Sequence, residues 1–442
     1  MSALTFRGGV KPHGEKARSS GVAIAPLAAP TEIVIPLSQH IGAPARACVA
    51  PGDEVLMGQV LGEPGGFVSA PVHASVSGKV KAIEPRPGQQ GVPTECVVIE
   101  NDGQDRASEV EGLGDGWAAA DPKEIKDRVA KAGLVGMGGA AFPTHVKLSP
   151  PPAKPIDAVI LNGAECEPYL TADHRIMLER PADVLAGLAI VRHVLGAKRA
   201  VIGVEENKPD AIEKLREAAA GSGVEILVLA KKYPQGAEKQ LIDAILGREV
   251  PSGGLPLDVG CVVQNVGTAA AIADAVIRGK LLYERVVTVT GAPVARPANL
   301  LVRVGTPVAA AIEACGGDLA NTAKLVLGGP LMGLAQHATG APVTKGTSGI
   351  LLLGPREVDA RPPAPCIRCG RCVGACPIHL VPTEIGNLAV RGLLEDTERA
   401  DALDCIECGC CAFGCPSRIP LVQQIRLGKA GILAARRKKG QG

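Results

Sequence analysis

Short stretches of alternating apolar and polar residues, separated by glycine and proline, fill the chain between about residues 30 and 105. The strand-like stretches read EIVIPL, GDEVLMGQVLG, SGKVKAIEP and ECVVIEN. Short strands at regular spacing, with turn residues between them, predict a compact all-β unit.

The pattern changes between about residues 115 and 282. Apolar strand-like runs (DAVILNG, RAVIGVE, VEILVLA, GCVVQNVG) alternate with amphipathic helix-like segments (PADVLAGLAIVRHVLG, KPDAIEKLREAAA, AEKQLIDAILG). This alternation predicts βαβ units around a largely parallel sheet. Ligands of such sheets bind beyond the carboxyl ends of the strands, so we expect a site there.

From residue 283 to 335, two strand-like runs precede a short helix. We expect Thr306 to be its N-cap and Pro307 its first residue, with Gly316 and Gly317 ending it. A proline-rich linker, GPREVDARPPAPC, leads into a last unit at 360–430. There TEIGNLAVRGLLEDTERADALD is predicted to be helical, and the basic tail at 434–442 is predicted to be frayed.

Composition narrows the function classes. A chain of 442 residues exceeds the size of a single core, so we expect several domains. A net charge of +2 argues against nucleic acid as a partner. The sequence contains neither the apolar core of a signal peptide nor an apolar run of about 18 residues, so we expect a chain that is soluble by itself.

Cysteine is concentrated in two runs of equal length, CIRCGRCVGACP at 366–377 and CIECGCCAFGCP at 405–416. The second has five cysteines, and superposing the runs places Arg371 opposite Cys410, which makes Cys410 the spare thiol. Both then follow the bacterial ferredoxin spacing C-x2-C-x2-C-x3-C-P. The predicted cluster ligands are Cys366, Cys369, Cys372, Cys376, Cys405, Cys408, Cys411 and Cys415.

In the ferredoxin pattern the fourth cysteine binds the other cluster. We therefore expect two [4Fe–4S] clusters, in which Cys415 completes the first run and Cys376 completes the second. Structural zinc and a disulfide framework are the alternatives. Zinc sites favour paired C-x2-C elements separated by a longer loop, which differs from this spacing.

A second candidate site begins with the glycine-rich segment GLVGMGGAAFPTHVKL, residues 133–148. Gly136, Gly138 and Gly139 leave the backbone N–H groups open to a phosphate or a flat ring, and Lys147 adds a cation. Such a loop alone also fits a plain turn. However, NGAECEP, YPQGAEKQ and QNVGTAAA each follow a predicted strand of the same unit, where a parallel sheet binds ligands.

These four segments resemble the FMN- and NADH-binding core shared by the flavoprotein subunit of respiratory complex I and the C subunits of Rnf complexes. Residues 49–84 resemble the barrel-sandwich hybrid of lipoyl-carrier domains, although APVHAS stands where a carrier has its lysine. Taken in order, the units resemble the Rnf C subunit family from about residue 6 to 430. The resemblance implies an α/β multidomain chain: a barrel-sandwich hybrid at 30–105, an FMN/NADH-binding α/β domain at 115–282, a soluble-ligand-binding β-grasp domain at 283–335, and a helical 2[4Fe–4S] ferredoxin domain at 360–430.

The resemblance also implies roles for individual residues. The glycine loop and Lys147 would lie against the flavin phosphate and the dinucleotide, and Asn162, Glu165 and Glu167 would approach the isoalloxazine and the nicotinamide ribose. Glu165 and Glu167 are the catalytic candidates, and their alternative interpretation is a solvated pair on a loop. The other implied pocket residues are Phe142, Tyr169, Gln235, Gly236, Glu238, Asn265 and Thr268.

Family membership would make the chain an electron-transfer subunit at the cytoplasmic face of the bacterial plasma membrane. NADH would reduce FMN by two electrons, and the clusters would carry single electrons to membrane-embedded and iron–sulfur partner subunits, and indirectly to ferredoxin. The alternatives are a cobalamin reductase of a microcompartment, a diaphorase subunit of a soluble hydrogenase or formate dehydrogenase, and a non-catalytic scaffold with structural clusters.

Overall fold

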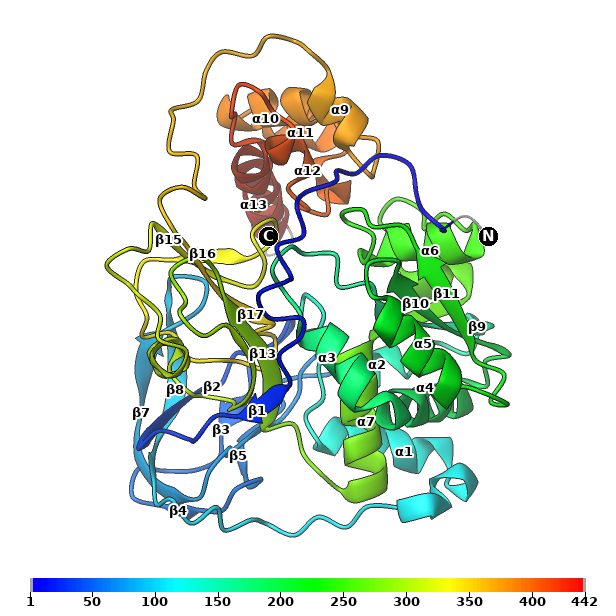
Figure 1. Cartoon of the computed structure of the whole chain (residues 1–442), viewed down its shortest axis with the longest axis vertical. Coiled ribbons are helices and arrows are strands. Elements are labelled where there is room, and N and C mark those ends of the chain that lie inside the picture. Colours follow the sequence, from blue (N-terminus) through cyan, green and yellow to red (C-terminus); the bar gives the residue numbers. More distant parts are fainter. Residues whose placement is uncertain (1–2, 440–442) are drawn as a thin grey trace.

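The computed structural model describes residues 3–439. Figure 1 shows the helical C-terminal unit at the top, the strands of the N-terminal unit at the lower left, and the parallel sheet with its helices on the right. No helix within residues 3–439 is long and apolar enough to cross a membrane.

The N-terminal unit consists of two small antiparallel sheets, with strand orders β2-β8-β7-β4 and β3-β5-β6. Side chains alternate between the two faces of each strand. Ile33 and Ile35 of β2 therefore point into the same core as Val97 and Ile99 of β8. The strands are β2 (Glu32–Pro36), β3 (Arg46–Ala47), β4 (Glu54–Val55), β5 (Val60–Glu63), β6 (Val72–His73), β7 (Gly78–Pro87) and β8 (Pro93–Asn101).

The second unit is a parallel sheet with strand order β11-β10-β9-β12. Val159 and Leu161 of β9 pack with the helices of one face, while Ile160 packs with α6 on the other face. The strands are β9 (Ala158–Gly163), β10 (Arg199–Glu205), β11 (Glu225–Leu229) and β12 (Cys261–Asn265). The helices are η1 (Gly114–Ala119), α1 (Pro122–Lys131), α2 (Thr144–Lys147), α3 (Ala172–Glu179), α4 (Pro181–Leu195), α5 (Pro209–Ala218), α6 (Glu238–Leu246), η2 (Pro256–Val259) and α7 (Val266–Arg278).

The third unit is a six-stranded mixed sheet with order β1-β14-β13-β17-β15-β16. It extends past residue 335 to β17 and also takes in β1 from the N-terminal region. Its elements are β1 (Ile24–Pro26), β13 (Glu284–Thr290), β14 (Ala298–Arg303), α8 (Val308–Ala314), β15 (Lys324–Leu327), β16 (Leu334–Gln336) and β17 (Gly349–Leu353). Helix α8 begins one residue later than predicted: Pro307 is the N-cap, and Thr306 does not cap the helix.

The C-terminal unit is helical. Its elements are α9 (Arg371–Ala375), α10 (Pro382–Val390), α11 (Leu394–Arg399), η3 (Ala402–Asp404), α12 (Cys410–Phe413) and α13 (Leu421–Lys439). The prediction of a frayed tail was wrong as far as Lys439, because α13 continues to that residue. The side chain of Arg436 on α13 pairs with Glu398, which explains part of this order. Residues 440–442 lie outside the described part of the chain.

Residues 3–22 form an extended segment, here called the N-terminal strap, that runs between the other units (Figure 1, dark blue). It contacts three of them. The Leu4 N–H donates to Val228 O at 2.9 Å in the parallel-sheet unit, and the Gly9 N–H donates to Ala375 O at 3.0 Å in the helical unit. Further along, the Arg18 guanidinium donates to Gly291 O of the mixed sheet.

A buried lysine joins the three larger units below the glycine loop. Lys345 donates to Pro71 O at 2.7 Å in the N-terminal unit and to Gly133 O at 2.8 Å in the parallel-sheet unit. Burial lowers the pKa of Lys345 to about 7. Burial, reinforced by this lysine, also lowers the pKa of His73 to about 3. A neutral amine still has two N–H groups for the two carbonyls, so the junction tolerates loss of the charge.

This junction predicts a pH-dependent stability. The unfolded lysine has a pKa near 10.4, so between about pH 7 and 10 the unfolded chain binds more protons at this group and the folded chain gains stability as pH rises. Across that window, the free energy of unfolding of the unaltered protein should rise by on the order of a few kcal/mol relative to that of Lys345→Met. Thermal unfolding at several pH values measures this difference. Lys324→Met, at an exposed position, is the control. Parallel pH profiles for the unaltered protein and Lys345→Met would contradict this expectation.

Candidate functional site

The carboxyl edge of the parallel sheet brings the predicted segments together. The turn 164–170 follows β9, the loop 230–237 follows β11, and α7 starts directly after β12. The Asn162 side chain connects the first two, since its Nδ2 donates to Gly236 O at 2.8 Å. The Thr268 hydroxyl on α7 accepts the Met137 N–H of the glycine loop at 2.9 Å. Segments separated by more than 100 residues therefore form one site.

The glycine loop packs tightly against Asn265. A Cβ atom on Gly138 would lie 2.8 Å from the Asn265 amide nitrogen, whereas one on Gly139 would meet open space. The loop is closed at its base by the Gly136 N–H, which donates to Phe142 O at 2.8 Å. One side of the loop is thus fixed, and its tip is accessible to a ligand.

Lys147 lies where α2 ends, and its ammonium pairs with Glu238 at 2.7 Å. It also donates to Val263 O at 3.1 Å, in the middle of β12. Lys147 and Glu238 are both partly exposed. A ligand phosphate at the loop would compete with Glu238 for this cation.

The buried side-chain amide of Gln235 indicates whether the site fits a flavin. Its side chain is fully buried, yet neither its amide nitrogen nor its amide oxygen has a hydrogen-bond partner within residues 3–439. Buried polar groups are almost always paired, so an unpaired amide at a strand-end loop indicates an absent ligand with both donors and acceptors. The edge of an isoalloxazine ring has both, and the residues here fit FMN.

Glu165 lies within a buried polar network. Its carboxylate accepts the Asp173 N–H at 2.7 Å and lies 3.6 Å from the ammonium of Lys16 in the strap. Asp173 in turn accepts from the Asn265 amide at 2.6 Å. Burial, together with the nearby Glu165 charge, raises the pKa of Asp173 to about 7. This acid is therefore poised to exchange a proton near neutral pH beside the pocket.

Glu167 and Tyr169 have other partners. The Glu167 carboxylate accepts the N–H groups of Leu331 at 3.1 Å and Met332 at 2.8 Å, so it fastens the loop 328–333 of the mixed sheet to the site. Gly329 allows this approach, because a Cβ there would lie 2.3 Å from the carboxylate. The Tyr169 hydroxyl donates to Glu357 at 2.9 Å and its ring packs against the mixed sheet.

The two cysteine runs share a backbone conformation as well as a spacing. The runs are offset by 39 positions, and left-handed residues recur at the same offset: Arg368 with Glu407, and His379 with Arg418. This conformation directs the N–H of Arg368 to the Cys366 sulfur and the N–H of Glu407 to the Cys405 sulfur, each at 3.4 Å. Donation of backbone N–H groups to sulfur suits thiolates that carry a cluster.

Four cysteines line one cavity of the helical unit. These are Cys376 of the first run and Cys405, Cys408 and Cys411 of the second. Cys410 points elsewhere, with its thiol donating to Tyr233 O at 3.7 Å. Within residues 3–439 no three His, Cys, Asp or Glu side chains are gathered to hold one metal ion. The cysteines instead surround a space, and a cube in which each thiolate binds a different iron requires such a space. They fit a [4Fe–4S] cluster with the crossed ligation predicted from the spacing.

The two runs differ in exposure. Cys366 and Cys369 are exposed, whereas Cys408 and Cys411 are buried. The second run adjoins the loop 230–237, because the Tyr233 hydroxyl donates to Cys408 O at 2.7 Å and Gln235 follows two residues later. Tyr233 thus joins this loop to the second run, while Cys366 and Cys369 of the first run face solvent.

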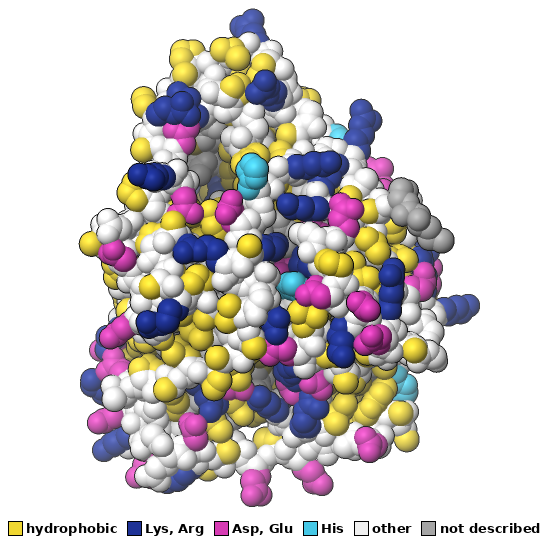
Figure 2. Space-filling view, viewed as in Figure 1, with side chains coloured by type: hydrophobic (Ala, Val, Ile, Leu, Met, Phe, Trp, Pro, Cys, Tyr) yellow, Lys and Arg dark blue, Asp and Glu magenta, His cyan; other side chains and the backbone are white. Residues whose placement is uncertain are grey.

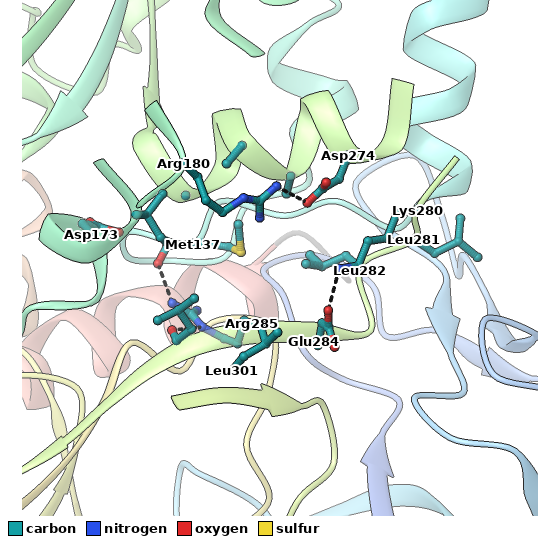
Figure 3. Close-up of a pocket in the computed structure, with 15 residues that line it drawn as sticks. Met137, Asp173, Arg180, Asp274, Lys280, Leu281, Leu282, Glu284, Arg285 and Leu301 are labelled. Atoms are coloured by element: carbon teal, nitrogen blue, oxygen red, sulfur yellow. Dashed lines mark hydrogen bonds and ion pairs between the residues drawn. The ribbon is translucent and has the colours of Figure 1, made fainter. Parts of the chain in front are cut away.

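A second hollow lies between α7 and β13 beside the glycine loop (Figure 3). Its charged groups mostly neutralise one another, since Arg180 pairs with Asp274 at 2.9 Å and Lys280 pairs with Glu284 at 2.6 Å. Arg285 lies between this hollow and the loop, and donates to Met137 O at 3.5 Å. Across the visible face of the molecule, basic and acidic side chains are interspersed (Figure 2), as the small net charge suggests.

Comparison with known proteins agrees with this geometry. Residues 129–274 match the family model of the Nuo51 FMN-binding domain, residues 4–104 match the RnfC barrel sandwich hybrid domain, and residues 286–335 match the SLBB domain. The C subunit of the Na+-translocating ferredoxin:NAD+ oxidoreductase complex of Acetobacterium woodii is 50% identical over 98% of both chains. This chain belongs to the Rnf C subunit family. The predicted family and fold class are confirmed.

Other relatives support the same membership. The C subunit of the proton-translocating ferredoxin:NAD+ oxidoreductase complex of Clostridium ljungdahlii is 49% identical to this protein, covering 98% of this chain and 94% of the relative. The C subunit of the ion-translocating oxidoreductase complex of Rhodobacter capsulatus is 42% identical, covering 100% and 86%. Among solved structures, an NAD+-reducing [NiFe]-hydrogenase in the air-oxidised state has a TM-score of 0.50 at 20% identity, covering 72% of this chain and 67% of its own, which shows a similar fold.

The sequence of this Rnf protein did not lead us to predict two residues of the site, Asp173 and Lys16. Asp173 lies in the first turn of α3, eight positions after Glu165, and its acidic type near a strand end was a usable signal. Lys16 lies about 150 positions before the turn that it contacts, and the sequence around it, PHGEKARSS, has the composition of a solvated loop.

The position of Glu167 predicts a structural effect on substitution. Glu167→Gln keeps the size of the side chain but sets an NH2 group against one of the two backbone N–H groups, which should destabilise the protein by about 1–3 kcal/mol. Denaturant unfolding measures this cost, and limited proteolysis should show faster cleavage in the loop 328–333. Glu249→Gln, at an exposed position, is the control. Equal stability of Glu167→Gln and the unaltered protein would rule out the carboxylate as the fastening of this loop.

The cysteine register predicts different outcomes for two adjacent substitutions. Cys410→Ser should retain the iron content and both cluster signals, because Cys410 is not among the cysteines that line the cavity and its thiol donates to the Tyr233 carbonyl. Cys411→Ser should lose one cluster's share of iron and the matching paramagnetic signal. Iron analysis and EPR spectroscopy of the two reconstituted variants measure this. Loss of a cluster in Cys410→Ser, with both clusters kept in Cys411→Ser, would show that the register is shifted by one.

Proposed function

We propose that this protein is the NAD(H)-reacting, peripheral subunit of an ion-translocating ferredoxin:NAD+ oxidoreductase complex at the cytoplasmic face of the bacterial plasma membrane. It would hold FMN at the carboxyl edge of the parallel sheet and two [4Fe–4S] clusters in the helical unit. The family is established by relatives of about half-identical sequence, and those named for sodium and for proton translocation match almost equally well. The identity of the electron carriers and of the partner subunits is part of what we propose.

The observation that supports it is the contact between the flavin pocket and the inner cysteines. FMN takes a pair of electrons from NADH as hydride and gives them up singly, and iron–sulfur clusters carry single electrons. In this chain, Tyr233 binds the Cys408 carbonyl, and the buried amide of Gln235, two residues later, has no partner within residues 3–439. The protein therefore holds its two-electron site and its first one-electron site against each other.

The exposure of the cysteines suggests an order. The inner site, completed by Cys376, is buried against the pocket, and Cys366 and Cys369 of the outer site are exposed. We place the outer site at the exit towards a cluster-bearing partner subunit and, through it, ferredoxin. The same path serves either direction of electron flow.

Individual pocket residues have distinct tasks in this proposal. The open tip of the glycine loop receives the phosphate end of the ligand, and Lys147 supplies the nearby cation. Asn162 and Asn265 order the strand-end segments through hydrogen bonds to Gly236 and Asp173, and Gln235 offers the buried amide to the ligand. Asp173 can exchange a proton there because its pKa is raised to about 7, mainly by burial. Glu165 holds the turn in place, and Glu167 seals the pocket towards the mixed sheet.

An anaerobic NADH titration of protein loaded with FMN, iron and sulfide tests the function. We expect the visible absorbance of the flavin to fall while EPR signals of reduced clusters grow in parallel, because the pocket adjoins the inner cysteines. Cys408→Ser is the matched control, in which the flavin should still bleach while the signal of the inner cluster is missing. A flavin that stays oxidised with NADH, in protein whose clusters dithionite reduces, would refute the proposed dinucleotide site and favour a scaffold.

A further inference from the structure

The ammonium group of Lys16 lies within the turn that follows β9. It donates to the carbonyl oxygens of Glu165 and Glu167 at 2.9 Å each, and also to that of Leu170. The Glu165 carboxylate lies 3.6 Å away. A single side chain from the strap thus binds backbone carbonyls along the whole turn.

A second lysine acts at the start of the same turn. Lys208, which precedes α5, donates to Ala164 O at 2.6 Å. Its ammonium also lies 3.4 Å from Glu205, and both side chains are almost fully buried. The carbonyls of 164, 165, 167 and 170 are therefore all directed at two ammonium groups, that of Lys208 buried and that of Lys16 partly buried.

This arrangement is energetically demanding. Burial of an ammonium group is costly unless it is fully hydrogen-bonded, and two like charges near each other add to the cost. Burial lowers the pKa of Lys16, the Glu165 carboxylate opposes that effect, and Lys208 adds to it. A simple surface turn requires neither lysine, so a requirement on the orientation of the turn is the better explanation.

The strap is fixed on both sides of Lys16. The Tyr169 N–H donates to Gly14 O at 2.7 Å, and the Thr171 hydroxyl donates to that of Ser19 at 2.8 Å. Lys16 is therefore held in place by neighbours on its own segment, and it does not rely on its contacts with the turn alone.

The carbonyl contacts determine where the N–H groups point. In a trans peptide the C=O and the N–H point in opposite directions, so the N–H of Glu165 points away from Lys208 and the N–H of Cys166 points away from Lys16. Neither N–H donates to any oxygen or sulfur of residues 3–439. Glu165 has a positive φ of 46°. Two successive free N–H groups at a left-handed residue attract an electron-rich acceptor.

We propose that Lys16 and Lys208 are positioning residues of the flavin pocket, which turn the peptide groups of 164–170 so that the N–H groups of Glu165 and Cys166 remain free to donate to the flavin ring. The inference rests on the proposed FMN site. The strap and the residue before α5 would together orient two N–H donors in advance of binding. These donors would bind the electron-rich reduced ring more strongly than the oxidised ring.

Four substitutions test this. Lys16→Met and Lys208→Met remove the ammonium groups at similar side-chain length. Lys11→Met in the exposed part of the strap and Lys214→Met on the exposed face of α5 are matched controls. FMN affinity is measured by fluorescence quenching, and the flavin midpoint potential by redox titration. Hydrogen exchange of residues 164–173 is followed in flavin-free protein.

We expect both test variants to bind FMN at least about ten-fold more weakly, which is the effect of one or two lost hydrogen bonds. Their bound flavin should have a more negative midpoint potential, because donors that favour the reduced ring are misdirected. Exchange in 164–173 should accelerate without flavin, while α4 keeps its protection. Both controls should match the unaltered protein.

The outcomes separate this inference from the function on which it rests. Faster exchange in both test variants, with unchanged FMN affinity and midpoint potential, would overturn the inference and leave the FMN site standing. Failure of the unaltered protein to bind FMN would overturn both. Because the two lysines lie on different elements, a folding failure of one variant leaves the other to decide.

Discussion

Parallel pairing of β9 with β10 and β12 is the constraint on which the rest of this structure depends. It forces the connections after these strands to one edge, so that the turn 164–170, Lys208 and Asn265 meet although they lie far apart in the sequence. The glycine loop reaches the same edge by packing on Asn265. Three other parts of the chain are attached here: the mixed sheet through Glu167, the helical unit through Tyr233 and the strap through Lys16.

The attachments are polar and buried, which makes the arrangement of the units specific. Lys16, Lys208 and Lys345 each place an ammonium among carbonyl oxygens of another segment. Each costs desolvation energy that is offset only when all partners are in place. An apolar seam would permit sliding between the units, whereas these contacts fix one register. An electron-transfer protein benefits from this, because its cofactor sites are carried by different units.

The sequence revealed local features well. Alternation identified β2 and β8, and apolar runs identified the four parallel strands. The internal comparison of the two cysteine runs predicts Cys410 as the spare thiol, and its contact with Tyr233 is compatible with that prediction. Contacts between distant segments were not predictable in the same way. Glu167 binds a loop about 165 residues later, and Lys16 binds a turn about 150 residues later. Nothing in the composition around either partner marks such pairs. Thr306 was misassigned because capping propensity at one residue did not account for the Pro307 conformation.

The strap also limits how the units can move relative to one another. It binds Val228 of the parallel-sheet unit through Leu4 and Ala375 of the helical unit through Gly9, five residues further along. The same segment then holds the turn 164–170 through Lys16. A rotation of the helical unit away from the parallel sheet would therefore pull on the segment that fixes this turn.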